Sequence, residues 1–271
     1  MIEFRSVGKT YPDGTIAVAD FSLIAPSGRT TVLVGSSGCG KTTLLRMVNR
    51  MVSPTSGSVW IDDLDVATTD PVALRRRIGY VMQNAGLLPH RKVIDNIATV
   101  PRLTGVSKAA AHVRALELMD LVGLDRAMAG RYPGQLSGGQ QQRVGVARGL
   151  AADPNILLMD EPFGAVDPIV RAELQQELLR LQRELHKTIL FITHDISEAL
   201  LLGDQIVILR RGADIAQAGS GLEIIARPAD EFVAEFVGLG GERQLDIRRV
   251  GDVEIVLDGS GRPLGQVSAR S

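Results

Sequence analysis

The stretch GSSGCGKTTLL at residues 35–45 places three glycines and a lysine between an apolar run and a helical pattern. The preceding TTVLV (30–34) is short, β-branched and apolar, as expected of a buried strand. In the following KTTLLRMVNRM, Leu44, Leu45 and Val48 recur at helical spacing. A glycine-rich turn from a buried strand into a helix is the setting in which a loop binds phosphate groups, so the sequence predicts an α/β fold.

This loop fits the pattern G-x-x-x-x-G-K-[ST]. Glycine leaves backbone N–H groups free, and the positive end of the following helix adds to a cradle for phosphate oxygens. We expect Lys41 to reach the β- and γ-phosphates and Thr42 to bind Mg²⁺. The expected nucleotide-binding residues of the loop are Gly35, Ser36, Ser37, Gly38, Cys39, Gly40, Lys41, Thr42 and Thr43.

A second apolar run, NILLMDE (155–161), ends in two acidic residues. A nucleotide site needs an anion at the end of a neighbouring buried strand to hold the metal. We expect Asp160 to bind Mg²⁺ and Glu161 to face the γ-phosphate as general base or water-polarising carboxylate. The alternative, that the pair merely ends a strand, does not account for the phosphate loop upstream.

The order of the predicted elements indicates a mixed sheet. Residues 1–34 are typical of antiparallel strands with a turn at residues 12–14, and residues 56–82 return to strand-like sequence. The runs 155–161 and 188–195 flank a helix that Asp167 caps, which implies a parallel sheet. The predicted core stripe of that helix is Leu174, Leu178, Leu181 and Leu185.

Residues 84–150 are predicted to form a helical insert. Ser107 can cap a helix that ends at Gly123. That helix carries apolar residues at i, i+3 spacing, namely Val113, Leu116, Met119 and Val122. The insert ends with LSGGQQQR (136–143), which begins an apolar-periodic helix containing Val144, Ala147 and Leu150. We expect Ser137 and the amides of Gly138 and Gly139 to form a second anion cradle at a helix N-terminus. The alternative interpretation of these glycines is a flexible linker.

LSGGQ between a phosphate loop and LLMDE is typical of the ATP-binding cassette family, which this sequence resembles over residues 1 to about 237. The resemblance implies a P-loop NTPase core with a mixed parallel sheet, an N-terminal antiparallel β subdomain and an α-helical subdomain, about 84–150, that carries LSGGQ. Residues 1–238 would then form the ATPase domain and 239–271 a short tail.

The resemblance also assigns roles to single residues. Tyr11 matches the aromatic that stacks on adenine, Asp167 the aspartate of the loop after the acidic strand, and His194 the histidine that contacts the γ-phosphate. Gln83 matches the glutamine whose loop links the nucleotide to a membrane partner. The implied catalytic residues are Glu161, His194 and Gln83, the implied metal ligands are Thr42, Gln83 and Asp160, and the implied signature residues are Ser137, Gly138, Gly139 and Gln140.

The implied partners follow from the same family. Two cassettes meet head to tail, so that ATP on one phosphate loop is covered by Ser137 and Gly139 of the other copy. The implied activity is hydrolysis of Mg-ATP coupled to transport through an integral membrane permease, with a solute-binding protein as an indirect partner. Because the γ-phosphate bridges the two halves, its loss would release them.

Two longer stretches resemble one branch of the family. IGYVMQNAGLLPHRKVIDNIATVP (78–101) and DEPFGAVDPIVRAELQQELLRLQ (160–182) are most similar to importers of glycine betaine, choline, carnitine and related osmoprotectants. GAVD stands where the family often has SALD, a small-for-small change that should preserve the position of Asp167. The alternatives are a cassette for an amino acid or polyamine, an exporter, an ABC ATPase of DNA repair or translation, or a nucleotide sensor without turnover.

Composition limits the classes of partner and the cellular location that we expect for this chain. Lys and Arg total 30 against 31 Asp and Glu, for a formal charge of -1, so we expect no broad basic face and no nucleic-acid partner. The basic run at residues 75–77 is expected to be a solvated helix face. With one cysteine, no leader at Met1 and no apolar run near ~18 residues, the chain is expected to be peripheral, on the cytoplasmic face of the inner membrane through its permease.

The tail carries a weaker pattern. VEIVLDGSGRPLGQV (253–267) predicts a hairpin around Asp258 and Gly259, and part of it resembles one strand-turn-strand of a regulatory CBS module. The interpretations left open are a remnant of such a module, an oligomerisation hairpin, or a segment without function.

Overall fold

The computed structural model describes residues 1–271 apart from 165, 240–245, 252, 258–260 and 268–271. Its largest sheet has the strand order β10-β9-β3-β8-β7-β6. These strands are β3 (Thr30–Gly35), β6 (Ile78–Val81), β7 (Ile156–Asp160), β8 (Thr188–Thr193), β9 (Gln205–Leu209) and β10 (Ile215–Gly219). All neighbours are parallel except β10, which pairs antiparallel with β9. The carboxyl ends of β3, β7 and β8 therefore meet at one edge.

The central strands are buried on both faces. Every residue of β3 and of β8 is buried, which explains why both appear as continuous apolar runs. Successive side chains enter different cores: Val32 and Val34 join one cluster, and Leu33 joins the other. Helices α7 (Pro168–Leu185) and α8 (Ile196–Leu202) contribute to the first cluster, and α1 (Lys41–Val48) contributes to the second.

The antiparallel part forms a second sheet, as the sequence predicts. Its order is β2-β1-β4-β5, with β1 (Ile2–Thr10), β2 (Ile16–Ala25), β4 (Ser56–Ile61) and β5 (Leu64–Asp65). The turn at residues 12–14 joins β1 to β2. Phe4 and Phe21 meet edge to face, 5.2 Å between centroids, in the same cluster as the buried residues of α1. The helix that follows the phosphate loop is thus packed between the two sheets.

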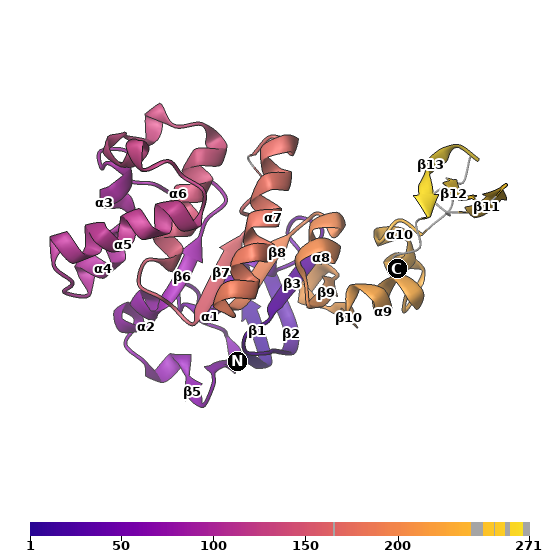
Figure 1. The fold of residues 1–271 in the computed structure, drawn as a ribbon. Helices are drawn as coiled ribbons and strands as arrows, with labels where there is room; N and C mark the ends of the chain where they lie inside the picture. Colours follow the sequence, from indigo (N-terminus) through magenta and orange to yellow (C-terminus); the bar gives the residue numbers. More distant parts are fainter. Residues whose placement is uncertain (165, 240–245, 252, 258–260, 268–271) are drawn as a thin grey trace.

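The helical insert contains α3 (Val93–Ile97), α4 (Thr99–Leu103), α5 (Lys108–Leu121) and α6 (Gly138–Leu150) (Figure 1). The Ser107 hydroxyl caps α5, accepting from the Ala110 amide at 3.2 Å. Within the apolar row at i, i+3 spacing, Val113 is 59% exposed, so the row is not buried as a whole. The reason is geometric: a row at i, i+3 advances about 300° per step and drifts around the helix. The buried residues of α5 are Ala111, Ala115, Leu118 and Met119.

The remaining helices are α2 (Pro71–Arg77), α9 (Gly221–Ala226) and α10 (Glu231–Phe236), with single 3₁₀ turns at Val66–Thr68, Arg126–Gly130, Pro133–Gln135 and Arg211–Ala213. The basic run on α2 is exposed, as predicted. Asp167 caps α7 by accepting from the Val170 amide at 3.1 Å, and Leu174, Leu178 and Leu181 are buried in its core stripe. Among the described residues, no helix is both long and apolar enough to cross a bilayer.

The tail forms a third sheet of β11 (Asp246–Val250), β12 (Val253–Leu257) and β13 (Pro263–Val267). β12 and β13 pair antiparallel, as expected of the predicted hairpin, whereas Asp258 and Gly259 of its turn lie outside the described residues. β11 adds a third strand to this pair. Strand pairing within this sheet does not involve the two larger sheets.

Candidate nucleotide site

The phosphate loop, residues 35–42, connects β3 to α1 at the carboxyl edge of the parallel sheet. A Cβ on Gly35 would lie 2.5 Å from the Leu209 carbonyl oxygen. A Cβ on Gly40, where φ is 113°, would lie 2.5 Å from the Ala17 carbonyl oxygen. Both positions require glycine because strands on two sides press against the loop. The backbone of the turn is thereby held between β9 and β2.

Lys41 is folded into the same loop. Its side chain is only 4% exposed, and its ammonium group donates to the carbonyl oxygens of Gly35 at 2.7 Å and Ser36 at 2.9 Å. These contacts hold the positive charge inside the curve of the loop. An anion bound there would meet a cation that is already in position.

Thr42 and Asp160 come together from neighbouring elements. The Thr42 hydroxyl lies 3.4 Å from Asp160 Oδ1, and the Arg46 guanidinium lies 3.9 Å from Oδ2. Hydroxyl and carboxylate oxygens are the donors that Mg²⁺ takes together with phosphate oxygens and water. No three His, Cys, Asp or Glu side chains gather in a metal-binding group within the described residues. The donor set therefore fits an ion whose shell is completed by phosphate and water.

Tyr80 on β6 also contacts Asp160, which the sequence analysis missed. Its hydroxyl donates to Asp160 Oδ2 at 3.0 Å. Burial, and then the negative charge of Asp160, raise the pKa of Tyr80 to about 12, so the phenol keeps its proton and stays a donor. The one available signal was the position of Tyr80 near the end of a predicted strand, but the sequence does not say that this strand pairs with β7.

Glu161 and His194 form a pair at the same edge. His194 Nδ1 lies 3.0 Å from Glu161 Oε2. Glu161 has a φ of 44°, in the left-handed region, and its amide donates to the Ile192 carbonyl at 3.1 Å. A non-glycine residue held there after a strand turns the chain sharply at a cost that the surrounding structure must offset. The backbone thus aims the carboxylate at the histidine that follows β8.

Gln83 lies beside the loop that follows Glu161. A Cβ built on Gly164 would be 3.1 Å from Gln83 Nε2, so the amide and this loop are close neighbours. Arg148 on α6 fixes the Gln83 loop from the other side, donating to the carbonyls of Ala85 at 2.6 Å and Gly86 at 2.7 Å. Burial lowers the pKa of Arg148. This arginine was not predicted from sequence, and it ties the signature helix to the Gln83 loop.

The signature segment forms the N-terminus of α6. Ser137 Oγ accepts from the Gln140 amide at 3.3 Å, and Gln140 Oε1 accepts from the Ser137 amide at 3.0 Å, which makes a capping box. Ser137 and Gly138 are exposed, whereas Gly139 is buried. A Cβ on Gly139 would lie 2.3 Å from Val170 Cγ1, so the glycine lets α6 approach the first turn of α7.

Two predicted parts of the site are not joined to the loop within this chain. Over the described residues, neither Tyr11 nor residues 137–140 form a hydrogen bond or ion pair with residues 35–43. Tyr11 begins the turn after β1, and its ring centroid lies 5.4 Å from Lys9 Nζ. The structure brings together the ends of β3, β7 and β8 and leaves the signature segment apart from them.

Known proteins share both the fold and these motifs. The ABC transporter family model matches residues 18–164. The glycine betaine/carnitine/choline transport ATP-binding protein OpuCA of Bacillus subtilis strain 168 is 49% identical over 238 residues, which are 88% of this chain and 62% of that protein. The glycine betaine uptake system ATP-binding protein YehX of Escherichia coli K12 is 48% identical over 254 residues, 93% of this chain and 82% of that protein.

A solved structure gives the same result. The dimeric, post-hydrolysis ATP-binding cassette MJ0796 bound to ADP and Pi matches with a TM-score of 0.74 and 33% identity, covering 81% of this chain and 98% of that one. The chain spans about 60% of the length of several curated relatives it matches, including carnitine and choline transport ATP-binding proteins. With a family model over more than half of its residues and relatives near 50% identity, the chain belongs to the ABC transporter family.

Proposed function

We propose that this chain is the ATP-hydrolysing subunit of an importer for quaternary ammonium osmoprotectants such as glycine betaine, choline or carnitine. The observation that carries the ATPase part is the Glu161–His194 pair, 3.0 Å apart, at the edge where Thr42 also meets Asp160. Glu161 is the general base for the attacking water, and the His194 imidazole contacts the γ-phosphate. Lys41 takes the β- and γ-phosphates, and residues 35–43 supply the remaining phosphate contacts.

The proposed metal is Mg²⁺, held by Thr42, Asp160 and Gln83. Bound there with ATP, it would neutralise charge on the phosphate oxygens. Tyr80 supports this assignment because its hydroxyl fixes the orientation of the Asp160 carboxylate. We assign Tyr11 to adenine stacking, since it offers an aromatic face near the start of β2.

The second half of each site is proposed to come from another copy of the chain. Ser137 and Gly138 are exposed at the N-terminus of α6, and over the described residues they form no hydrogen bond or ion pair with the phosphate loop of their own chain. In the head-to-tail dimer, Ser137, Gly138, Gly139 and Gln140 cover the ATP on the opposite loop, and Asp167 lies between the sites. The dimeric form of the MJ0796 cassette supports this arrangement.

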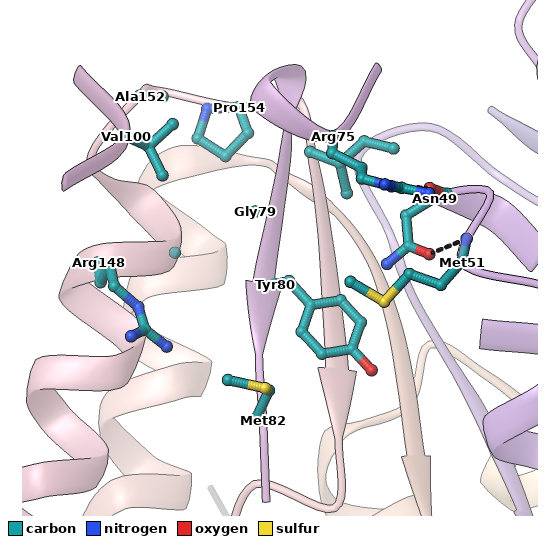
Figure 2. A pocket seen from close by; sticks show the side chains of 12 residues that line it. Asn49, Met51, Arg75, Gly79, Tyr80, Met82, Val100, Arg148, Ala152 and Pro154 are labelled. Carbon is teal, nitrogen blue, oxygen red and sulfur yellow. Dashed lines mark hydrogen bonds between the residues drawn. The ribbon is translucent and has the colours of Figure 1, made fainter. Parts of the chain in front are cut away.

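The permease is proposed to dock on a groove beside β6. The groove has a volume of about 240 Å³, and Met51, Tyr80, Met82, Val100 and Arg148 are among its lining residues. Figure 2 shows β6 along its middle, with Arg148 on the α6 side and Met51 on the other. Met51 is 55% and Met82 37% exposed, so flexible apolar side chains are available to a short helix of the partner. Docking would place the chain on the cytoplasmic face of the membrane.

A binding experiment tests the ATPase part. Lys41→Ala should weaken ATP binding strongly, because the phosphate charge loses its buried partner. Lys108→Ala is the matched control: Lys108 is an exposed lysine that begins α5, and its removal should leave affinity unchanged. Equal ATP affinity in the Lys41→Ala and unmodified chains would contradict the proposed phosphate site. Chelation of Mg²⁺ should abolish hydrolysis.

The solute class is supported by relatives named for glycine betaine, carnitine and choline transport. Deleting the gene should abolish ATP-dependent uptake of glycine betaine or choline under high salt, and it should leave amino-acid and sugar uptake unchanged. Unchanged betaine, choline and carnitine uptake with a defect in another solute would overturn the solute class and leave the ATPase standing. Residues 1–238 are proposed as the ATPase domain, with 239–271 as an appended tail.

A further inference from the structure

A buried carboxylate, Glu198, lies behind His194 and belongs to none of the motifs. Glu198 is 6% exposed and stands in the first turn of α8, which Asp195 caps. One carboxylate oxygen accepts from the Thr193 hydroxyl at 2.7 Å, and the other accepts from the Gln175 side-chain amide at 3.2 Å. Burial raises its pKa, which reflects the cost of keeping a charge there. A carboxylate buried at that cost has both oxygens committed to two particular side chains.

Thr193 connects the Glu198 carboxylate to the backbone around His194. Its hydroxyl oxygen accepts from the Asp195 amide at 3.0 Å while its hydrogen is donated to Glu198. The hydroxyl therefore has one orientation, and the Thr193–Asp195 bond spans His194. Without Glu198 as acceptor, the hydroxyl could rotate, and the turn that carries the imidazole would lose its fixed geometry.

The network also reaches α7 through Gln175. This residue lies about two helical turns after Asp167, the cap of α7. One helix therefore connects Asp167, which we propose to lie between the two ATP sites of the dimer, to Glu198. A small cavity of about 40 Å³ lies between Glu198 and the Glu161–His194 pair. The residues that line it are Glu161, Gly164, Arg171, Thr193, His194, Asp195 and Glu198. Arg171 Nε is buried there and finds no hydrogen-bond partner among the described residues. Glu198 thus faces the same space as the Glu161–His194 pair.

We propose that Glu198 is a positioning residue for ATP hydrolysis: through Thr193 it holds His194 against Glu161, and through Gln175 it connects that pair to α7. The inference rests on the ATPase activity proposed above. The hydrogen bonds of the Glu198 carboxylate go to Thr193 and Gln175, neither of which is a proposed nucleotide or metal ligand, so we expect an effect on turnover and not on binding. A displacement of the imidazole by about 1 Å is enough to cost roughly 100-fold in rate.

Two substitutions at position 198 distinguish a loss of the hydrogen-bond network from a loss of side-chain packing. Glu198→Ala removes both acceptors, and kcat should fall by roughly 10- to 100-fold with little change in the KM for ATP. Glu198→Gln can keep both hydrogen bonds if the Gln175 amide flips, so kcat should return to within a few-fold of the unmodified chain. If Glu198→Ala does not fold, Thr193→Val and Thr193→Ser make the same comparison, since only serine retains the hydroxyl.

A His194→Ala background gives the decisive comparison. If Glu198 acts through His194, Glu198→Ala should not lower the residual kcat further in that background, because the imidazole that Glu198 positions is already absent. Equal additional losses in both backgrounds, or a Glu198→Gln chain as slow as Glu198→Ala, would overturn the inference. An unmodified chain that hydrolyses no ATP would instead overturn the proposed function.

A spectroscopic readout is independent of turnover. The sequence contains four histidines, so the imidazole resonance of His194 can be assigned by its disappearance in His194→Ala. It should shift or broaden in Glu198→Ala and in Thr193→Val, and it should stay close to its original position in Glu198→Gln and Thr193→Ser. An unchanged His194 resonance in Glu198→Ala would contradict the positioning role even if activity were absent.

Discussion

Two glycine-rich helix N-termini in this molecule differ in how much of a binding site each contains. At α1 the loop is closed by backbone contacts, a buried lysine lies within it, and Thr42 meets Asp160 beside it. At α6 the capping serine is exposed, its hydroxyl is used by its own helix, and the buried glycine serves packing against Val170. The first terminus has a buried ammonium group, a hydroxyl and a carboxylate next to it, whereas the side-chain hydrogen bonds described for Ser137 and Gln140 at the second are those of its own cap.

The difference indicates that a glycine-rich helix N-terminus provides only part of what a phosphate-binding site requires. Helix N-termini favour anions in general, but affinity requires charge and converging donors as well. The α1 terminus lies at the carboxyl edge of the parallel sheet, where β7 and β8 deliver acidic and imidazole side chains. The α6 terminus lies on the helical insert, so its use depends on what is brought to it.

The largest expected effect is at the carboxyl edge of the parallel sheet, beside α1. Glu161→Gln should lower ATP turnover by roughly 10²–10⁴ because a general base is lost, while Mg-ATP binding stays intact. The ATP-bound dimer should become long-lived, which size exclusion in the presence of ATP measures. Glu117→Gln is the control, since Glu117 is an exposed residue of α5 paired with Arg114. A monomeric Glu161→Gln chain with unchanged turnover would refute the role.

A smaller effect is expected at the α6 terminus. Ser137→Arg adds a long side chain at the exposed cap and should weaken ATP-dependent association by roughly 10- to 100-fold, the result of about 1–3 kcal/mol of overpacking. The same chain should bind ATP normally as a monomer, because its own phosphate loop is untouched. Titration with labelled ATP measures this, and Ser137→Ala controls for loss of the cap. Loss of monomeric binding in Ser137→Arg would show that the comparison of the two termini is wrong.

The glycines of the two termini should differ in whether they can be rescued. Gly139→Ala should lower the free energy of unfolding by about 1–3 kcal/mol through the clash with Val170. Adding Val170→Ala should recover most of that loss, because the obstacle is a side chain. Gly40→Ala meets the Ala17 carbonyl at 2.5 Å, so no side-chain substitution should rescue it. Denaturant unfolding of the single and double variants tests this; equal rescue at both sites would contradict it.

The smallest effect concerns Tyr80. At neutral pH, Tyr80→Phe should cost about 1 kcal/mol of stability, since Asp160 loses one donor and keeps others. The folded chain raises the pKa of Tyr80 from 10.0 to about 12, so this contribution is fully present below pH 10 and is lost as the pH rises toward 12. Tyrosinate absorbance should show one of the three tyrosines titrating late. All three titrating together in the folded chain would contradict the buried contact.

The parts of the site that follow from chain order were predictable from sequence. The phosphate loop, the acidic pair and His194 each follow a buried strand. Parallel strands place their carboxyl ends at one edge, so the contacts of Thr42 with Asp160 and of Glu161 with His194 could be expected. The capping roles of Ser107 and Asp167 were equally readable, because a cap depends on residues three positions away.

Contacts between distant elements could not be predicted. Tyr80 reaches Asp160 only because β6 pairs with β7, and the short run IGYV does not specify its neighbour. Glu198 meets Gln175 because α7 and α8 lie together on one face of the sheet. The exposure of Val113 shows the same limit within a helix: the row was apolar, but the neighbours of the helix decide which side is buried.

The two bonds from Arg148 to the carbonyls of Ala85 and Gly86 have a mechanical consequence. Arg148 lies in the last turn of α6 and Ser137 caps its first, so the 13-residue helix is a rod of about 20 Å between them. Because these hydrogen bonds hold one end of α6 to the loop that follows Gln83, a movement of that loop would be transmitted along the helix to Ser137. In the proposed assembly, a neighbour docked beside Gln83 and the ATP that Ser137 covers would therefore be connected by a single helix.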